Sequence, residues 1–577
     1  MPRHRTPGHR TPARPATPTS LLDQAVALVH TFGHGVAERK LELLRALERG
    51  ELPRARDVLR LHELLCFSRA YPDDRRVLRR VERMLAGFAR RPDLVRHAGA
   101  LEDSGIAGTV TRFRFFSPTA DWLVERWPDR VRIDWPRFDA DALEPWLPHL
   151  VHPAQVPALD EYDMPMREWL EWLKSRAETD AAFLVRRFRR LPMSEPARET
   201  LYDQLDPPLI LEPGPDTPSR TAARWKRSGV HAQKRALSHE RPGAAQWTCL
   251  RPRRVHAVSA REGQRLIDLA RAAMVTRSRD LYAFTNGDPL DVRVVDFGDG
   301  LEFACIGTKP DRRLLLEAVY GYLTLKNGVP IGYVLTAALF GSAEIAYNVF
   351  DTWRGAEAGA VYARVLAMTR WLYGCDAFTI VPYQLGEGND EALESGAWWF
   401  YQKMGFQPRE RAAIRLMRHE LARMRRDPAH RSSLAVLRRL ARANLHLDLG
   451  RRRPDVLGEL PLANVGLHAG RFLAERFNTD REAAERCASE AQRLLGAGPD
   501  ESWSASERES WSRWAPVIGM LPGVGRWSPI ERRKLVDVVR AKGGQRESDF
   551  VRAFDAHARL RAALRRLAHA PPPRPRP

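Results

Sequence analysis

The segment 395–408, SGAWWFYQKMGFQP, places the aromatic residues Trp398, Trp399, Phe400 and Tyr401 side by side. Aromatic residues at this density usually fill a core, because each of them buries a large apolar area. A tyrosine can also act through its hydroxyl group, which donates or accepts a proton. Tyr401 is therefore the first candidate for chemistry, with a core aromatic residue as the alternative.

A second segment, NVFDTWRGAEAGAVY at 348–362, combines an apolar strand end, a turn that contains glycine, and a helix start. A helix start presents unpaired backbone N–H groups, and the helix dipole favours an anion there. Glycine lets the backbone approach a ligand closely, and Arg354 can direct a fork of donors at a phosphate oxygen. The segment therefore predicts an anion-binding turn.

Together, the two segments resemble the GNAT superfamily of N-acetyltransferases. In that family an apolar strand ends in V-x-P-x-aromatic-R/Q-x-x-G-x-G/A before a helix, which is matched here by Val349, Trp353, Arg354 and Gly359. A later family helix and its exit read A-x-x-F-Y-x-K-x-G-F, which is matched by Ala397, Phe400, Tyr401, Lys403, Gly405 and Phe406. The resemblance covers residues 246–412, under a third of the chain.

The resemblance implies that acetyl-CoA or another acyl-CoA serves as co-substrate, that no metal takes part, and that the acyl group moves to an amine of an unidentified substrate. It implies that Tyr401 protonates the leaving thiolate. Glu344, five residues before Val349, is expected to accept the amine proton. The co-substrate is expected to contact Asn348, Val349, Phe350, Arg354, Gly355, Glu357, Ala358, Gly359 and Ala360.

Each of these roles has a plainer alternative. Glu344 can be a surface or paired carboxylate of a strand, and Arg354 can be a solvated arginine at a helix start. Glu357 stands where the family has its first glycine, and Asp351 stands where it has proline. A carboxylate near a pyrophosphate opposes its binding, so Glu357→Gly is expected to bind acyl-CoA more tightly. A non-catalytic scaffold with the same fold is the alternative function.

The expected fold is α/β (α+β), a GNAT-like mixed sheet between helical regions. Ser259 and Glu262 form a capping box for a helix to about Met274, and Asn327–Gly328 predicts a hairpin turn. Strands are expected at 314–325, 330–340, 343–350 and 377–382, with a last strand within 406–417. Helices are expected at 356–374 and at 391–404, the second ended by Gly405. The loop 382–395 can collect a cationic substrate group or be an ordinary exposed loop.

The rest of the chain reads as helical or irregular. We expect a disordered basic arm at 1–20, a helical domain at 21–206, a linker or irregular segment at 207–245, the GNAT-like domain at 246–412, a C-terminal helical region at 413–570 and a disordered tail at 571–577.

Composition narrows the partners. The net charge is +21, which invites a nucleic acid as partner. Only nine of the 93 basic residues are lysine, however, so the charge follows an arginine bias typical of a GC-rich genome. A nucleic acid is therefore the less favoured partner, and a nucleic-acid-associated protein is the third alternative. Five scattered cysteines and no long apolar run predict a cytoplasmic protein without disulfides or a membrane span.

Overall fold

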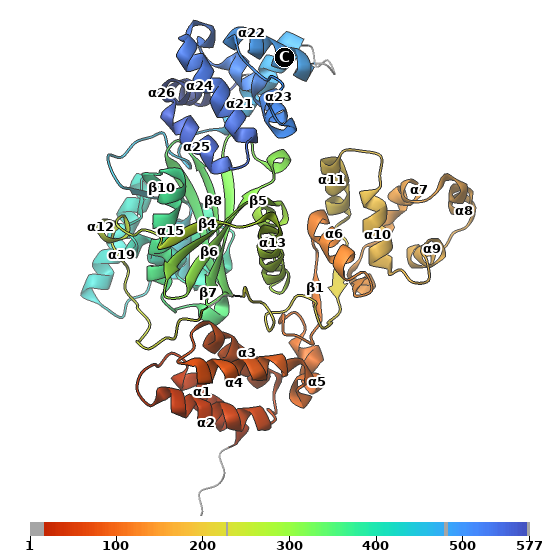
Figure 1. Ribbon diagram of the computed structural model, residues 1–577, viewed down its shortest axis with the longest axis vertical. Helices are drawn as coiled ribbons and strands as arrows, with labels where there is room; N and C mark the ends of the chain where they lie inside the picture. The colour runs from red at the N-terminus through yellow and green to blue at the C-terminus, as the bar shows by residue number, and fades with distance from the viewer. Residues whose placement is uncertain (1–16, 227–228, 478–482, 574–577) are drawn as a thin grey trace, which may run out of the picture. The chain divides into compact units, whose positions relative to one another are not determined.

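The computed structural model describes residues 17–226, 229–477 and 483–573, and the chain divides into two units (Figure 1). Unit 1 contains the described residues up to Ala223, with His231–Ala236 and Val275–Arg279. Unit 2 contains the remainder, including Leu237–Met274 and the described residues from Asp280 onward. The chain therefore passes from one unit to the other several times, and the segment expected as a linker or irregular segment at 207–245 contributes to both units.

Unit 1 is mainly helical. Its helices are α1 (Pro18–Leu28), α2 (Val36–Arg49), α3 (Ala55–Ala70), α4 (Arg75–Ala86), α5 (Pro92–His97), α6 (Ser117–Arg126), α7 (Leu147–Leu150), α8 (Val156–Glu161), α9 (Met166–Leu173), α10 (Asp180–Arg189) and α11 (Glu195–Leu205). A small antiparallel sheet, in the order β1 (Thr111–Phe113), β3 (Leu209–Leu211), β2 (Val131–Ile133), was not expected. Strands of three residues carry too little alternation to be recognised.

The ends of the chain differ partly from expectation. Helix α1 begins at Pro18 with Thr17 as its N-cap, inside the segment expected as a disordered arm. The rest of that expected arm, residues 1–16, and the end of the expected tail, residues 574–577, lie outside the described residues.

Unit 2 is built on a nine-stranded mixed sheet. In spatial order its strands are β11 (Gln407–Pro408), β12 (Leu445–Asp448), β10 (Ala377–Ile380), β9 (Ser342–Val349), β8 (Val329–Leu339), β7 (Ala318–Lys326), β6 (Leu301–Thr308), β5 (Gly287–Gly298) and β4 (Arg254–Ala257). Among these strands, β9 and β10 pair in parallel and the other neighbours pair antiparallel. The expected turn at Asn327–Gly328 joins β7 to β8, with both residues at positive φ.

Helices cover both faces of this sheet. Tyr373 of α15 (Ala358–Tyr373) packs on Tyr320 of β7, with ring centroids 5.8 Å apart. Phe284 of α14 (Tyr282–Thr285) packs on Tyr333 of β8 at 6.3 Å. The strand register places Tyr320 and Tyr333 on opposite faces, so α15 and α14 lie on opposite sides of the sheet. The expected helix after Ser259 is α13 (Ala260–Val275), and its capping box is present.

Three local expectations were wrong. The helix expected at 391–404 is divided into α17 (Asp390–Glu394) and α18 (Ala397–Lys403), because Gly396 adopts a φ of 68° between them. The strand expected within 406–417 is reduced to β11, after which α19 (Arg411–Arg426) begins. The sheet also continues past residue 412, because β12 inserts between β10 and β11.

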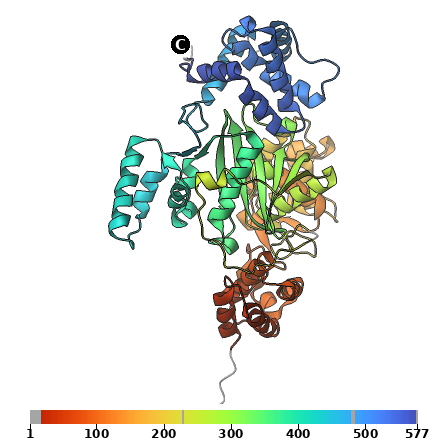
Figure 2. The same cartoon turned by 60° about the vertical axis from the view of Figure 1, so that its left-hand side comes forward.

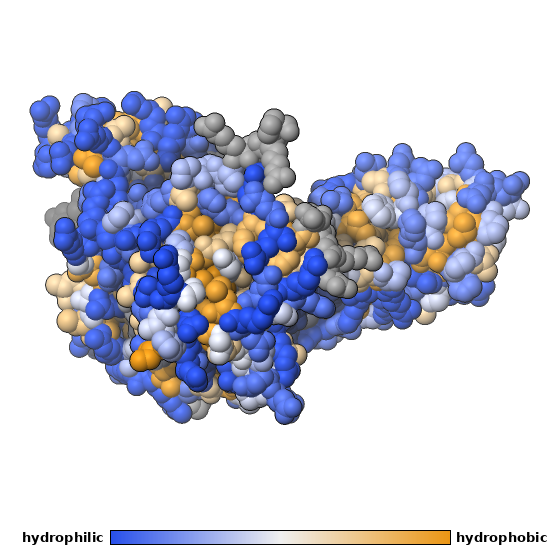
Figure 3. All heavy atoms as spheres, turned by 90° about the horizontal axis from the view of Figure 1, so that it is seen from above, coloured by the Kyte–Doolittle hydropathy of each residue, from blue (hydrophilic) through white to orange (hydrophobic). Residues whose placement is uncertain are grey.

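The remaining helices are α12 (Ala244–Trp247), α16 (Pro382–Leu385), α20 (Leu434–Ala441), α21 (Ala463–Phe477), α22 (Ala483–Leu495), α23 (Ala505–Met520), α24 (Pro529–Gly543), α25 (Glu547–Ala556) and α26 (Ala558–His569). One continuous cluster of buried apolar residues joins the sheet, α15 and the C-terminal helices. Hydrophilic residues dominate the face of the molecule in Figure 3. No helix among the described residues is long and apolar enough to cross a membrane.

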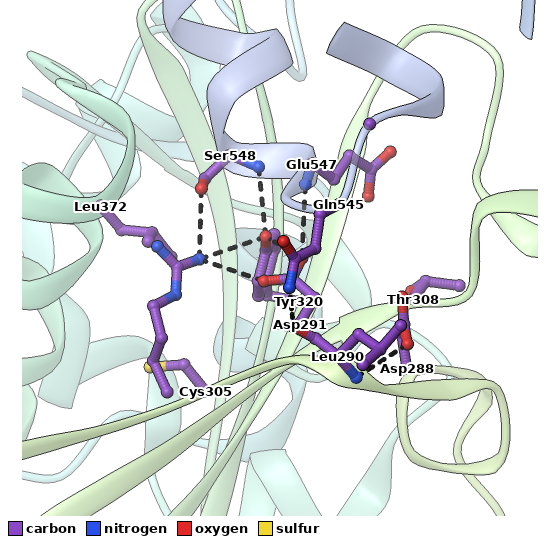
Figure 4. Close-up of polar contacts among 12 residues, drawn as sticks. Asp288, Leu290, Asp291, Cys305, Thr308, Tyr320, Leu372, Gln545, Glu547 and Ser548 are labelled. Carbon is purple, nitrogen blue, oxygen red and sulfur yellow. Dashed lines mark hydrogen bonds and ion pairs between the residues drawn. The ribbon is translucent and has the colours of Figure 1, made fainter. Parts of the chain in front are cut away.

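A buried polar network attaches the start of α25 to the sheet (Figure 4). The hydroxyl of Tyr320 donates to Asp291 and accepts from the backbone N–H of Ser548 at 3.1 Å. Arg293 donates to the hydroxyl of Tyr320 at 3.2 Å and to that of Ser548 at 3.1 Å. The backbone N–H of Glu547 donates to Asp291 at 3.3 Å. A carboxylate thus faces the first N–H groups of the helix, where the dipole favours a negative charge.

We expect Tyr320→Phe to destabilise the protein by about 1–3 kcal/mol, because it removes a buried donor from Asp291. Urea unfolding measures the change. The matched control is Tyr383→Phe, which removes a hydroxyl from a side chain that is 58% exposed and is expected to change stability by less than about 0.5 kcal/mol. Equal unfolding midpoints for the two variants would contradict a stabilising role of the network.

Candidate functional site

The site begins with an incompletely paired strand. On one edge, β9 pairs with β8 along its whole length, from Ser342 to Val349. On the other edge it pairs with β10 at three residues, Ser342, Ala343 and Glu344, and β10 ends at Ile380. The backbone from 345 to 349 is therefore not paired with a strand on that edge. An unpaired strand edge can hydrogen-bond an extended ligand that carries amide groups.

Tyr401 of α18 lies at this edge. Its side chain is buried, and its ring packs on Phe400, Tyr362 and Phe406, with centroids 5.4, 5.5 and 6.0 Å away. Burial raises the pKa of the Tyr401 hydroxyl, while a hydrogen bond with the backbone of Tyr347 in β9 acts in the opposite direction. Tyr401 is thus both a core aromatic residue and a neutral hydroxyl group beside the strand.

Its two tryptophan neighbours have another role. The indole N–H of Trp398 donates to the carbonyl oxygen of Leu440 at 3.2 Å, and that of Trp399 donates to the hydroxyl of Ser432 at 3.2 Å. Both acceptors belong to the segment that contains α19 and α20. Phe400 and Tyr401 therefore pack in the core under β9, whereas Trp398 and Trp399 hold the segment that contains α19 and α20.

Beyond β9, the chain turns into α15. Gly355 has a φ of 83° and Glu357 a φ of 46°, and no side chain caps the helix start. The N–H of Val361 bonds to the carbonyl of Glu357, so the N–H groups of Ala358, Gly359 and Ala360 precede the first intrahelical hydrogen bond. The turn therefore has the donors that an anion needs.

Two buried polar atoms near the turn have no hydrogen-bond partner among the described residues. They are Oδ1 of Asn348, at the end of β9, and Nε1 of Trp353, in the turn. The backbone N–H of Phe350 is used within the protein, since it donates to Ile331 at 3.0 Å. A buried polar atom without a partner costs free energy, so both atoms are suited to bind a polar ligand.

The charged residues of the turn are already paired. Arg354 forms ion pairs with Asp351 at 2.8 Å and with Glu391 of α17. Glu357 pairs with the ammonium group of Lys326, 3.3 Å away at the end of β7. Glu357 is therefore not the unopposed negative charge that the sequence suggests, because Lys326, which is 4% exposed, balances it.

Gly359 is constrained by the chain itself. A Cβ atom at this position would lie 2.6 Å from the carbonyl oxygen of Glu240 and 2.9 Å from Cγ of Arg241. Real Cβ contacts are longer than this, so any side chain at 359 would displace residues 240–241. The glycine therefore admits a crossing segment of the same unit, in addition to any ligand.

Glu344 lies on the other face of β9. In the strand register Glu344 lies beside Ala337 of β8 and Thr379 of β10, on the face of the sheet that α14 covers. Tyr347 is on the opposite face, where its ring packs on Tyr362 of α15. Burial, and then the nearby Glu317, raise the pKa of the half-buried Glu344. The Tyr401 hydroxyl bonds to the backbone of Tyr347, three residues beyond Glu344. Three residues along a strand span about 10 Å, so Glu344 and the Tyr401 hydroxyl are not in contact.

Sequence analysis missed a polar group beside Glu344. His446 of β12 lies 2.9 Å from a carboxylate oxygen of Glu459 and 3.1 Å from the hydroxyl of Thr379, which is the register neighbour of Glu344. Burial and then Arg409 lower the pKa of His446 to about 3. The three residues are far apart in sequence, and β12 was expected to be helical, so no local pattern indicated the group.

Comparisons with protein-family models, with curated proteins and with solved structures find no match to this chain. The function must therefore be argued from the site itself.

The ion pair of Glu357 and Lys326 can be measured by a double-mutant cycle. We expect Glu357→Ala to destabilise the protein by about 1–3 kcal/mol, because it leaves a buried ammonium group without this partner. In the Lys326→Met background the same change is expected to cost less. Asp351→Ala, at a side chain that is 80% exposed, serves as the control. Equal effects of Glu357→Ala in both backgrounds would show that the pair contributes nothing.

Proposed function

We propose that the protein is an acyl-CoA-dependent N-acyltransferase with a GNAT-like domain. The observation that carries the proposal is the edge of β9, which loses its strand partner after Glu344 and leads directly into the helix start at Ala358. The pantetheine arm of coenzyme A contains two amides and is followed by a pyrophosphate. An open strand edge suits the amides, and an uncapped helix start suits the anion.

The order of elements supports the same proposal. The sequence pattern of the central region predicts a helix, antiparallel strands, a helix, a strand, a helix and a strand. This order corresponds to α13, the strands β5 to β9, α15, β10, α18 and β11. The two matched segments, at 348–362 and 395–408, contact each other through Tyr362, whose ring packs on Phe400 and Tyr401.

The proposed roles follow from these positions. The amine attacks the thioester carbonyl, the C–S bond breaks, and the thiolate takes the proton of the Tyr401 hydroxyl. Glu344 and Tyr347 point to opposite faces of β9, so Glu344 does not reach the amine beside Tyr401 directly. The proton lost by the amine passes to Glu344 through solvent. A raised pKa makes Glu344 a stronger base than an exposed carboxylate. Asn348 and the N–H groups at 358–360 would hold the co-substrate.

A second function, a non-catalytic scaffold, is favoured by two specific observations. The carbonyl group of Glu240 approaches Gly359 at the helix start, and two carboxylates already pair with Arg354. Both reduce what the turn can offer to a pyrophosphate. Binding experiments separate the two functions.

Titration calorimetry with acetyl-CoA tests binding. We expect the unmodified protein to bind and Gly359→Glu to bind at least tenfold more weakly, because the new side chain displaces residues 240–241 and brings a carboxylate to the helix start. Gly466→Glu in α21 is the matched control, since it also replaces a helical glycine and has no atom within 4 Å of the new Cβ. Absence of binding by the unmodified protein, or equal binding by Gly359→Glu, would favour the scaffold.

Release of free thiol from acetyl-CoA in the presence of a panel of amines tests the chemistry. Tyr401→Phe is expected to keep the affinity for acetyl-CoA and to lower turnover by about 10²–10⁴-fold, the usual contribution of a positioned acid. Tyr362→Phe removes a hydroxyl from the same aromatic cluster and is expected to keep most of the activity. If both variants keep full turnover, Tyr401 is a core residue and nothing more.

A further inference from the structure

Two helices that project from one edge of the sheet carry a concentrated positive charge. The edge strand β11 leads into α19 and α20, and β12 returns the chain to the sheet beside it; Figure 2 shows both helices, in cyan, standing away from the strands. Residues 411–442 contain ten arginines, one glutamate and one aspartate, a net charge of +8. More than a third of the charge of the whole chain thus lies in 32 residues. We call residues 411–442 the arginine hairpin.

The arginines of α19 form one stripe. At about 100° per residue, Arg411, Arg415, Arg418, Arg425 and Arg426 fall within a sector of about 100° on the helix surface. The buried residues Ala413, Met417 and Glu420 lie on the opposite side of the helix. All five arginines are exposed, and the stripe is about 22 Å long. The stripe therefore faces solvent along the full length of α19.

The arginines of the stripe lie outside the ion pairs that the described part of the chain forms. Within the described residues, none of its five arginines forms an ion pair, and the same is true of Arg439 and Arg442 at the end of α20. The glutamate of the hairpin, Glu420, is buried and bonds to the hydroxyl of Ser432 at 2.6 Å. Asp427 accepts a hydrogen bond from the N–H of Ala429 after the end of α19. The positive charge is thus directed outward and is available to an anionic partner.

The surroundings of the stripe decide which class of partner fits it. A protein interface needs apolar or aromatic residues at its centre, and an amphipathic helix that binds a membrane needs an exposed apolar face. The large apolar residues of α19 are buried or half-buried, and among the described residues of the hairpin Leu434 is the large apolar side chain that is markedly exposed. Phosphate backbones of nucleic acids, in contrast, are bound by rows of arginines without an apolar centre.

We infer that the arginine hairpin binds the phosphate backbone of a nucleic acid without reading its sequence. The length of the stripe corresponds to about six base pairs of duplex, and each guanidinium group can donate two parallel hydrogen bonds to a phosphate. By composition alone a nucleic acid is the less favoured partner, because the charge follows a general arginine bias. The fold changes this judgement, because it gathers the arginines on one face and turns the acids away.

The hairpin is held in place by the consecutive tryptophans of α18. Trp398 bonds to Leu440 of α20, and Trp399 bonds to Ser432 in the connection between the two helices. Ser432 in turn donates to Glu420 of α19, so the hairpin is attached to the helix that carries Tyr401. A second contact joins Arg438 of α20 to Asp390 of α17 at 3.6 Å. A bound nucleic acid would therefore lie on a surface that is fixed to the candidate site. The inference itself does not depend on the proposed acyl transfer.

Fluorescence anisotropy with a labelled 20-base-pair DNA duplex and an RNA duplex of the same sequence tests the inference. The full chain is expected to bind at least one of them, with affinity falling steeply between 50 and 200 mM salt. In Arg411→Gln/Arg415→Gln/Arg418→Gln, we expect at least tenfold weaker binding at 50 mM salt. The slope of log affinity against log salt should fall by about 2–3, close to one per lost contact.

A matched control removes the same charge elsewhere. Arg533→Gln/Arg565→Gln/Arg566→Gln neutralises three exposed arginines of α24 and α26 and is expected to bind within twofold of the unmodified protein. Arg439→Gln/Arg442→Gln, in α20, is expected to weaken binding and provides a second test if the first triple variant unfolds. Circular dichroism verifies folding.

Three outcomes would overturn the inference: no binding to either duplex at 50 mM salt, equal losses in the two triple variants, or binding to vesicles of phosphatidylglycerol and to neither duplex. A preference between the duplexes would show whether DNA or RNA is the natural source of the phosphates.

Discussion

The geometry of the candidate site depends on how far two parallel strands stay together. β9 and β10 pair at three residues and then separate, because β10 ends at Ile380 while β9 continues to Val349. The backbone beyond Glu344 keeps its bonds to β8 and has no strand on its other side. Proteins usually cover or shorten unpaired strand edges, so an open edge inside a sheet is expected to bind a ligand or another segment. The hydroxyl of Tyr401 and the turn to α15 both lie along it.

Charged side chains are paired in the interior of unit 2 and left exposed on one part of its surface. Inside, acids and bases are paired at close range, as in the contacts of Asp291 with Arg293 at 3.5 Å and of Glu547 with Lys542 at 2.5 Å. Burial makes an unpaired charge costly, so these networks fix the C-terminal helices on the sheet. On α19, in contrast, the five arginines of the stripe are exposed and form no ion pair within the described residues. The same residue type therefore holds the fold together in one place and is left available to bind a ligand in another.

The two proposals share one structural element. Helix α18 directs Tyr401 toward β9 and its two tryptophans toward the arginine hairpin. Each indole N–H has a defined acceptor, which is the usual condition for burying tryptophan. The aromatic run is thus more than filling of the core, since its members point in different directions and serve different contacts.

The sequence by itself determined the local elements of the central region. The capping box at Ser259, the turn at Asn327–Gly328 and the segments that became β7, β8, β9, α15 and β10 depend on neighbouring residues, so their patterns are visible in the chain. It also singled out Tyr401 and the turn at 354–359. The short strands β1, β2, β3, β4 and β12 were not predicted, because segments of three or four residues gain their stability from distant partners. The longer strands β5 and β6 were not predicted either. Only the tertiary structure decided that Lys326 balances Glu357, that Glu240 approaches Gly359, that His446 stands beside Thr379, and that the arginines of α19 share one face. These relations join residues far apart in sequence, or depend on which side of an element is buried, and packing of the folded chain sets both.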